Sequence, residues 1–497
     1  MNDDATTKTD STQAPASKPS GKGSSAGARS QATKVEHFSP AERSARGKAA
    51  RAEVPRTSHG DWEPPLHRPD PVELLEEQAQ SRVPELVPIR YGRMLVSPFT
   101  FYRGAAYLMA SDLSGGPRTG LHSQLCGDAH LSNFGVFAAP DRRLIFALND
   151  FDETLPGPFE WDVKRLVASF AVAGRDRGFD DKVRARINNV VARCYRETIR
   201  SFAEMKNLDL WYARLDVEQL FQDLRDRATP EQRKRMEKNL EKSRTKDSMK
   251  AFAKLTEVVD GEVRIINDPP LLVRIDDLAG DRGEFAHEKM RQLIRGYRRT
   301  LAGDRRKLME RFRYVDAARK VVGVGSVGTR AWVALMLGRD NEDPLFLQAK
   351  EAQASVLEPF LGKSEFANHG QRVVEGQRLM QAASDILLGW LHVDEGVDGQ
   401  PRDFYIRQLW DAKGSAMVEL MEPSGLEAYA EICGWTLARS HARSGDAIAI
   451  GSYLGSGDVF DLAMARFAEA YADQNERDYA ALKEAVESGR VKAETGL

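Results

Sequence analysis

Two polar clusters on either side of one short apolar run constrain this chain more than any other feature. They lie between Cys126 and Glu153, in CGDAHLSNFGVFAAPDRRLIFALNDFDE. The apolar run, Leu144 to Leu148, has the length of a buried strand, so it would deliver the second cluster beside the loop that holds the first. The side chains concerned are Asp128, His130 and Asn133 in the first cluster, and Asp150 and Asp152 in the second. We therefore predict one site built from a loop and a strand end.

Carboxylate and amide oxygens gathered in this way fit a magnesium-dependent phosphoryl-transfer site. Magnesium prefers oxygen ligands in an octahedral shell and usually takes one or two from protein carboxylates. A further carboxylate can orient or deprotonate an acceptor hydroxyl. The alternative interpretation is structural, because Asp and Asn side chains often hydrogen-bond to nearby backbone and stabilise turns. Two clusters separated by one strand favour the metal–phosphate interpretation.

The order Gly-Asp-x-His-x-x-Asn, then a strand, then Asp-Phe-Asp-Glu resembles the catalytic core of protein kinases and, more closely, of aminoglycoside phosphotransferases. This resemblance implies that Asp128 is the catalytic base, with His130 beside it in the catalytic loop, and that Asn133 is a metal ligand. It implies Asp150 as the principal metal ligand, with Asp152 at the position where kinases carry glycine. The cofactors that it implies are ATP and Mg²⁺.

Two more residues are candidates for this site, the first of them through the same resemblance. The segment PFEWDVKRLVASFAVAGR has helical periodicity. In kinase-like families the helix after the metal-binding segment carries an aspartate that supports the catalytic loop, and Asp162 is the candidate for that role. Arg103, in an upstream apolar stretch, is placed to face a phosphate, although pairing with a core carboxylate is the favoured interpretation.

A second motif lies in KVVGVGSVGTRAWVALMLG, which contains Gly323-x-Gly325-x-x-Gly328. Glycines at this spacing let the backbone turn tightly and approach a phosphate. The motif suits a dinucleotide-binding turn that opens a helix, or a kinase loop that joins two antiparallel strands. The strand-like runs WVALML and LFLQAK that follow favour the kinase arrangement.

The run LFLQAK ends on Lys350, whose ammonium would then lie over nucleotide phosphates. Such a lysine needs an acidic partner on a neighbouring helix, for which Glu375 is the first candidate and Glu358 the second. The structural alternative is a surface lysine at a strand end. DFYIRQLWDAKGS, residues 403–415, is predicted to be a strand leading into a hinge that binds adenine through its backbone.

The order of these segments is the reverse of the kinase order, because the catalytic and metal segments precede the glycine loop. A helix ending near His441 resembles the one that precedes the catalytic loop in the phosphotransferases. We therefore predict an α+β fold that is bilobal, protein-kinase-like and circularly permuted, with a mostly helical large lobe and a small antiparallel-sheet lobe. Permutation is tolerated where the joined ends lie close together at the surface. It predicts that the glycine loop faces the acidic clusters across a cleft.

The predicted organisation begins with a disordered arm over residues 1–60. This stretch is rich in small and charged residues and nearly free of large apolar ones, so it cannot offset its ordering entropy. The large helical lobe, with the catalytic and metal-binding loops, is expected over 61–317. The small nucleotide-binding lobe is expected over 318–412, and helices that return to the large lobe over 413–497.

Composition narrows the classes of partner. A net charge of −2 gives no electrostatic case for binding nucleic acid or an anionic membrane. Three widely spaced cysteines exclude a disulfide framework and a cysteine-rich zinc site, and they suit a cytoplasmic protein. No apolar run approaches the length of a membrane span. The expected partners are a nucleotide and an unknown acceptor, and the sequence does not define the oligomeric state.

The predicted function is magnesium-dependent transfer of phosphate from ATP to a small-molecule acceptor, with nucleotidyl transfer by the same residues left open. One alternative is a catalytically silent nucleotide-binding or scaffold protein on the same fold. A metallophosphoesterase is another, since Asp128-x-His130 resembles the first metal motif of that class, but neither Gly-Asn-His nor His-x-His occurs among the nine histidines. A dinucleotide-dependent oxidoreductase would leave the acidic clusters without a role.

The chain as a whole also resembles an uncharacterised bacterial family known as domain of unknown function 2252. That resemblance runs from about Arg90 to the C-terminal helices, and it implies no established activity.

Overall fold

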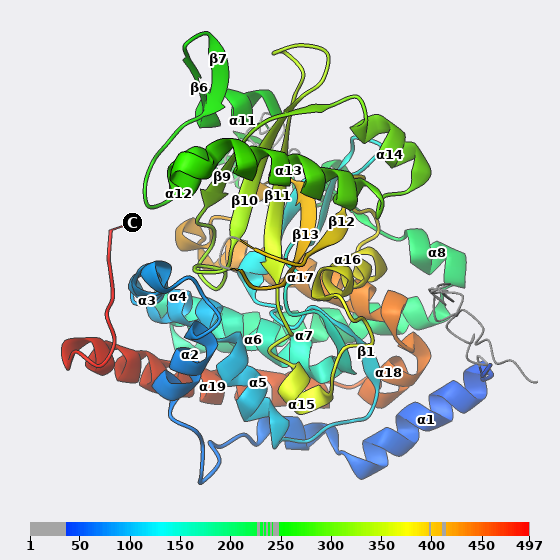
Figure 1. The fold of residues 1–497 in the computed structure, drawn as a ribbon. Helices are drawn as coiled ribbons and strands as arrows, with labels where there is room; N and C mark the ends of the chain where they lie inside the picture. Colours follow the sequence, from blue (N-terminus) through cyan, green and yellow to red (C-terminus); the bar gives the residue numbers. More distant parts are fainter. Residues whose placement is uncertain are drawn as a thin grey trace, which may run out of the picture. The chain divides into compact units, whose positions relative to one another are not determined.

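A six-stranded antiparallel sheet, in the order β12-β13-β11-β10-β9-β8, forms one layer of the fold (Figure 1). The computed structural model describes residues 36–496 apart from 226–228, 232, 235–236, 239–240, 242–247, 397–398 and 410–413. The strands are β8 (Leu272–Arg274), β9 (Arg313–Lys320), β10 (Ala331–Leu337), β11 (Pro344–Ala352), β12 (Gly389–Val393) and β13 (Arg402–Gln408). The predicted strands WVALML and LFLQAK are thus confirmed as β10 and β11.

Both faces of this sheet are covered, which explains why β10 and β11 are apolar almost throughout. Helix α13 (Gly283–Arg298) crosses one face, where its Tyr297 packs in a cluster with Met336 and Leu347 (Figure 1). Residues of opposite parity, such as Leu335, pack on the other face with α11 (Ser248–Leu255). The two-residue period of a strand sends alternate side chains to these two clusters.

A layer of long helices gathers below the sheet in the view of Figure 1. It consists of α6 (Phe159–Asp176), α7 (Asp181–Glu204), α17 (Pro423–Ser444), α18 (Ala447–Leu454) and α19 (Val459–Glu487). Helix α6 is central, because every residue from Phe159 to Gly174 is buried. Its buried charged residues therefore need partners inside the protein.

Two smaller sheets include the strands that precede and follow the first acidic cluster in the sequence. One pairs β1 (His122–Leu125) with β4 (Leu155–Pro158). The other has the order β14-β2-β3-β5 and comprises β14 (Gly414–Ser415), β2 (Phe134–Ala138), β3 (Leu144–Leu148) and β5 (Leu215–Asp216). All five residues of β3 are buried, as its apolar sequence predicts.

Shorter elements complete the described chain. Before β1 come α1 (Pro40–Glu53), η1 (Arg56–Gly60), α2 (Pro71–Ala79), η2 (Pro84–Leu86), α3 (Val87–Met94), α4 (Pro98–Gly104) and α5 (Ala106–Ser114). After it come η3 (Leu131–Asn133), α8 (Asn207–Tyr212), α9 (Val217–Arg225), β6 (Thr256–Val259), β7 (Glu262–Ile265), α12 (Ile275–Ala279), η4 (Gly280–Arg282), α14 (Gly303–Met309), α15 (Glu358–Leu361), α16 (His369–Met380) and η5 (Val418–Leu420). Each helix in the described part of the chain is too short or too polar to span a lipid bilayer.

The fold is therefore a mixed α+β fold with antiparallel sheets, as predicted. The predicted small-lobe boundary at 318 needs correction, since β8 already belongs to the six-stranded sheet and α11 and α13 cover it. The sheet and its covering helices thus begin near Ser248. Residues 40–497 form one compact unit.

The predicted disordered arm also needs correction over residues 40–60. Helix α1 packs on α18, and its Gly47 lies so close that a Cβ there would be 2.1 Å from the Ala449 carbonyl oxygen. This contact uses glycine and alanine, so the segment packs without the large apolar residues whose absence suggested disorder. Residues 1–35 lie outside the described part of the chain.

His59, in η1, provides a test of this packing. It is buried, and its Nε2 lies 2.8 Å from the Tyr453 hydroxyl. Burial, and then the Lys164 ammonium, lower the pKa of His59 from 6.5 to about 3. Because the pKa is lowered in the folded protein, the unfolded chain binds this proton at a higher pH than the folded protein does. The free energy of unfolding therefore has its full value above pH 6.5 and decreases as the pH falls toward 3.

We expect His59 to make the free energy of unfolding about 2 kcal/mol lower at pH 5 than at pH 7. Urea denaturation of wild type and His59→Gln at both pH values measures this contribution as the difference between their pH dependences. Equal pH dependence in the two proteins would contradict burial of a neutral His59.

Candidate functional site

The loop that carries the first acidic cluster is held by Asp162, which α6 presents at its N-terminal end. The Asp162 carboxylate accepts hydrogen bonds from the backbone N–H groups of Cys126 (2.7 Å) and Gly127 (3.0 Å). His441 Nε2, at the end of α17, lies 3.2 Å from the same carboxylate. Asp162 therefore makes the predicted contacts with the backbone of the loop that carries Asp128.

Gly127 joins the two clusters directly. Its φ is +82°, and a Cβ at this position would lie 2.4 Å from the carbonyl oxygen of Glu153. Only glycine meets both requirements without displacing the backbone. The loop before Asp128 thus packs against the segment that carries Asp150 and Asp152.

Asp128 is held by an arginine that the sequence analysis did not identify. Arg165, on α6, places Nε at 2.8 Å and an Nη at 2.6 Å from the same oxygen, Asp128 Oδ1. Oδ2 is left with His130 Nε2 at 3.7 Å and no hydrogen bond to a described residue. Burial raises the pKa of Asp128, although Arg165 opposes the shift. One carboxylate oxygen is therefore fixed and the other is available to a ligand.

His130 orients this loop. Its Nδ1 accepts a hydrogen bond from the Ser132 N–H at 3.2 Å, so the remaining proton of the neutral ring lies on Nε2, facing Asp128. Burial, followed by Arg103 and Arg165, lowers the pKa of His130 well below its usual value. The ring is thus neutral near pH 7 and supports Asp128.

Asn133 and Asp150 offer oxygen atoms from the two clusters. Asn133 Nδ2 donates to the Asp128 carbonyl oxygen at 2.6 Å, which leaves Asn133 Oδ1 for a ligand. The Asn149 N–H donates to the Asn133 carbonyl oxygen at 2.9 Å and ties the clusters together. The Asp150 side chain is 33% exposed. An amide oxygen and a carboxylate are the donors that Mg²⁺ prefers, so this pair fits the ion.

Asp152 is engaged by three donors from the six-stranded sheet and its glycine loop. Its Oδ2 lies 2.6 Å from Lys350 Nζ and 3.3 Å from Ser326 Oγ, and its Oδ1 accepts the Tyr405 hydroxyl at 2.7 Å. Burial would raise the pKa of Asp152, but the Lys350 ammonium outweighs it and lowers the pKa to about 2. With both oxygens bonded, Asp152 holds Lys350 rather than presenting a free edge to a metal.

The predicted partner of Lys350 needs correction. Glu375 pairs with Arg378 at 3.2 Å, and Glu358 accepts from the Ser355 N–H at 3.3 Å. In the described part of the chain, the carboxylates beside Lys350 Nζ are Asp152 at 2.6 Å and Asp150 at 3.5 Å. The residue that approaches the site from the neighbouring helix is not an acid but an arginine.

That arginine is Arg372, on α16. Its guanidinium donates to the carbonyl oxygens of Thr154 (2.7 Å), Asp152 (2.8 Å) and Gln353 (2.8 Å). It thereby joins the metal segment to the end of β11. The sequence around Arg372 shows only helical periodicity, which does not predict these contacts.

The glycine loop joins β9 to β10, which pair antiparallel, so it does not open a helix. Gly323 and Gly328 have φ values of +68° and +88°, which the motif predicts. Helix α3 and the turn between α2 and η2 hold the two ends of the glycine loop. Arg93 donates to the Gly323 carbonyl oxygen at 2.6 Å, and the Val83 N–H donates to that of Gly328 at 2.8 Å.

A cavity of about 890 Å³ brings the two motifs together. The residues of the predicted site that line it are Asp128, His130, Asn133, Asp150, Asp152, Gly323 and Gly325. Lys350 is buried behind the cavity wall and contacts the wall residue Asp152. Gly328 is also buried and packs against Arg82. The glycine loop and the acidic clusters thus share one cavity despite their separation in sequence. Residues 410–413, within the predicted hinge, lie outside the described chain.

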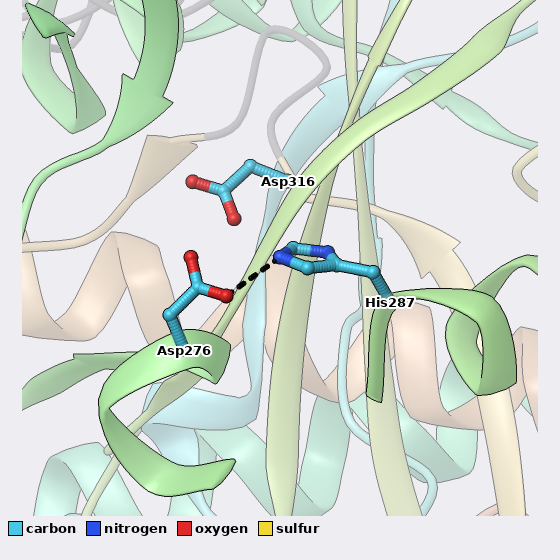
Figure 2. Close-up of side chains that lie close together, drawn as sticks. All are labelled: Asp276, His287 and Asp316. Carbon is cyan, nitrogen blue, oxygen red and sulfur yellow. Dashed lines mark hydrogen bonds and ion pairs between the residues drawn. The ribbon is translucent and has the colours of Figure 1, made fainter. Parts of the chain in front are cut away.

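A second group of metal-type side chains lies elsewhere. Among the described residues, Asp276 of α12, His287 of α13 and Asp316 of β9 point toward one another, with ligand atoms within 4.8 Å (Figure 2). None of the three lines the cavity. His287 Nε2 is 2.9 Å from Asp276 and Nδ1 is 2.7 Å from the Tyr314 hydroxyl.

The remaining atoms of this group are also engaged. Asp316 accepts the N–H groups of Ile265 (2.9 Å) and Ala317 (2.8 Å), and an Arg274 nitrogen lies 3.2 Å from Asp276. The guanidinium supplies the positive charge that a metal would bring. We therefore assign the group to a structural ion-pair network.

The fold and cavity define an α+β protein with antiparallel sheets and an acidic, glycine-loop-bordered site. The model of the family described as "Uncharacterized protein conserved in bacteria (DUF2252)" matches residues 82–485. The chain belongs to this family, as the sequence resemblance implies. No curated protein and no solved structure matched the chain. The matched region begins at the helices that hold the glycine loop.

Removing the Asp162 carboxylate tests how the loop that carries Asp128 is supported. Asp162→Ala leaves two buried backbone N–H groups without acceptors, so we expect the free energy of unfolding to fall by about 3 kcal/mol. Asp162→Asn retains one acceptor oxygen, so its free energy of unfolding should fall by less. Asp394→Ala is the control, because its side chain is 99% exposed. Urea denaturation measures all three, and equal stability of Asp162→Ala and the control would contradict the assignment.

Proposed function

We propose that this protein is a magnesium-dependent phosphotransferase that moves phosphate from ATP to an acceptor hydroxyl of a small molecule. The observation that carries this proposal is the shared cavity, in which a glycine loop between antiparallel strands meets two acidic clusters. Glycine backbone suits phosphates, and paired carboxylates suit a metal and a proton acceptor. Each motif alone is weak, and their meeting across many intervening residues is what supports the proposal.

The proposed fold is bilobal and kinase-like in circularly permuted order. The contact between α17 and β1 supports the permutation. Ser444, the last residue of α17, accepts a hydrogen bond from the Gln124 N–H of β1 at 3.1 Å. Helix α17 therefore ends where the strand leading to the catalytic loop runs, although some 300 residues separate them. Joining these two segments would restore the order found in kinases.

In the proposed reaction Asp128 is the proton acceptor. The acceptor hydroxyl would hydrogen-bond to Oδ2, the oxygen that Arg165 leaves unoccupied. As the hydroxyl oxygen bonds to the terminal phosphorus, the bond to the bridging oxygen breaks, ADP leaves and the proton passes to Asp128. A carboxyl pKa raised by burial brings this base closer to neutral pH.

The nucleotide would lie between the glycine loop and the acidic clusters. Asp152 holds Lys350 in one orientation, so its ammonium is fixed before a phosphate arrives. Asn133 Oδ1 and Asp150 would hold Mg²⁺, which supplies charge neutralisation at the phosphates. Tyr405 and Ser326 fix Asp152 in turn.

The alternatives receive less support. A metallophosphoesterase needs several histidine and carboxylate ligands around one point. Among the described residues, the group that meets such a spacing is the Asp276–His287–Asp316 network, away from the cavity. A silent nucleotide-binding protein would use the same nucleotide contacts, so catalysis must be measured separately from binding.

A thermal-shift titration tests nucleotide binding. We expect ATP with Mg²⁺ to stabilise the wild type, by about 2.7 kcal/mol at a hundredfold excess over Kd. Asp150→Asn should remove the dependence on magnesium, and Lys350→Met should weaken ATP binding in either condition. The surface variant Asp394→Ala is the control. Stabilisation by NAD in place of ATP, or by neither, would refute the proposal.

Asp128→Asn separates catalysis from binding. This variant keeps the shape of the side chain but loses the base, so ATP binding should remain. Transfer from radiolabelled ATP to an acceptor, or slow hydrolysis of ATP to ADP, should fall at least about 100-fold. Unchanged turnover would remove Asp128 from the mechanism, and a wild type that binds ATP without any turnover would favour the silent alternative.

A further inference from the structure

We propose that Arg103 binds the terminal phosphoryl group of the nucleotide and so forms an anion subsite between the glycine loop and Asp128. This inference rests on the proposed function, and it assigns to that site a positive group that the kinase-like motifs do not include. Pairing of Arg103 with a core carboxylate is the expectation from the sequence. The structure differs from that expectation.

Arg103 lines the cavity without a hydrogen-bonding partner. Across the described part of the chain, its guanidinium makes no hydrogen bond or ion pair, and its Nε is buried without an acceptor. The other arginines of the cavity wall are engaged, since Arg82 donates to Val327 and Arg402 pairs with Glu351 at 2.7 Å. A largely buried arginine without a partner is costly unless a ligand supplies the anion.

The position of Arg103 suits a phosphate rather than the adenosine part of a nucleotide. A Cβ on Gly325 would lie 3.2 Å from the Arg103 carbonyl oxygen, so the middle glycine of the loop touches the backbone of Arg103. Its guanidinium interacts electrostatically with Asp128 and Glu419. Arg103 therefore lies between the loop that would cover the phosphates and the base that would face the acceptor.

Charge balance in the cavity points the same way. The Lys350 ammonium already pairs with Asp152 and Asp150, so it offsets only part of the negative charge of a polyphosphate. The other acidic residues of the cavity wall are Glu77, Asp128, Glu153, Glu351, Glu358 and Asp403. A ligand with several negative charges needs an additional cation in this setting. A guanidinium, with its planar fork of donors, matches two phosphate oxygens at once.

Arg103 is also preorganised. It lies in the last turn of α4, whose start is fixed by a capping box between Ser97 and Thr100. The neighbouring helix α3 holds the glycine loop through Arg93 and the Gly323 carbonyl oxygen. The loop and the arginine thus keep a fixed separation, which is what an electrostatic subsite requires.

Isothermal titration with ATP and with ADP, each with Mg²⁺, tests this assignment. Wild type should bind ATP more tightly than ADP. Arg103→Gln should weaken ATP binding about 10- to 100-fold, because a charge-assisted bidentate contact is lost, and leave ADP binding unchanged. Arg103→Lys, which keeps the charge but not the fork, should give an intermediate loss. Arg186→Gln, on the exposed side of α7, is the matched control and should bind both nucleotides as wild type does.

The outcomes separate this inference from the function on which it rests. A wild type that binds neither nucleotide refutes the proposed function. ATP binding that Arg103→Gln leaves intact, or an equal loss for ATP and ADP, overturns the terminal-phosphoryl assignment while nucleotide binding stands. The first of these two results would direct Arg103 to an anionic group of the acceptor. Should Arg103→Gln fail to fold, judged by its thermal melt, the ratio of ATP to ADP affinity in Arg103→Lys decides the question.

Discussion

The carboxylate of Asp162 is the interaction on which the rest of the site depends. It comes from α6, in which every residue from Phe159 to Gly174 is buried, and it accepts hydrogen bonds from two backbone N–H groups of the loop that carries Asp128. Because the loop then packs through Gly127 on Glu153, the same carboxylate also determines where the segment with Asp150 and Asp152 lies. His441 approaches it from α17, so three distant parts of the chain meet at one buried charge. The helical layer thus acts as a rigid base for a short polar loop.

Buried charges in pairs organise the walls of the cavity. Arg165 holds one oxygen of Asp128, and Lys350 holds one oxygen of Asp152. Each pair joins a different layer to the loop region, the first from the helices and the second from the six-stranded sheet. Such pairs add little net stability once their desolvation is counted, but they fix orientation. The two ion pairs therefore fix the orientation of Asp128 and Asp152 in the cavity wall.

Sequence reasoning located the parts of the site that are encoded locally. Asp128, Asp150 and the glycine loop lie in short motifs next to recognisable strands, so their neighbours could be predicted. The contacts of Arg165, Arg372 and Lys350 depend on how separate elements pack, and the spacing of residues in the sequence does not predict such packing. Glu375, for example, lies on the neighbouring helix as expected but pairs with Arg378. One local pattern does indicate the role of Arg165. The charged residues of the sequence DVKR lie in an otherwise apolar, buried helix, so they need partners inside the protein. Helix α1 was missed because glycine and alanine make its contacts.

The attachment of the glycine loop to the N-terminal helices has a consequence for motion. The carbonyl oxygens of Gly323 and Gly328 are bonded to Arg93 and to the Val83 N–H, and Val327 is buried between them in a cluster with Ile89. Lifting the loop therefore breaks both bonds and uncovers an apolar side chain, or carries the helices with it. Opening is a cooperative local-unfolding event rather than a fluctuation of a few residues. Displacement of the glycine loop is therefore coupled to the stability of a segment that lies outside both motifs.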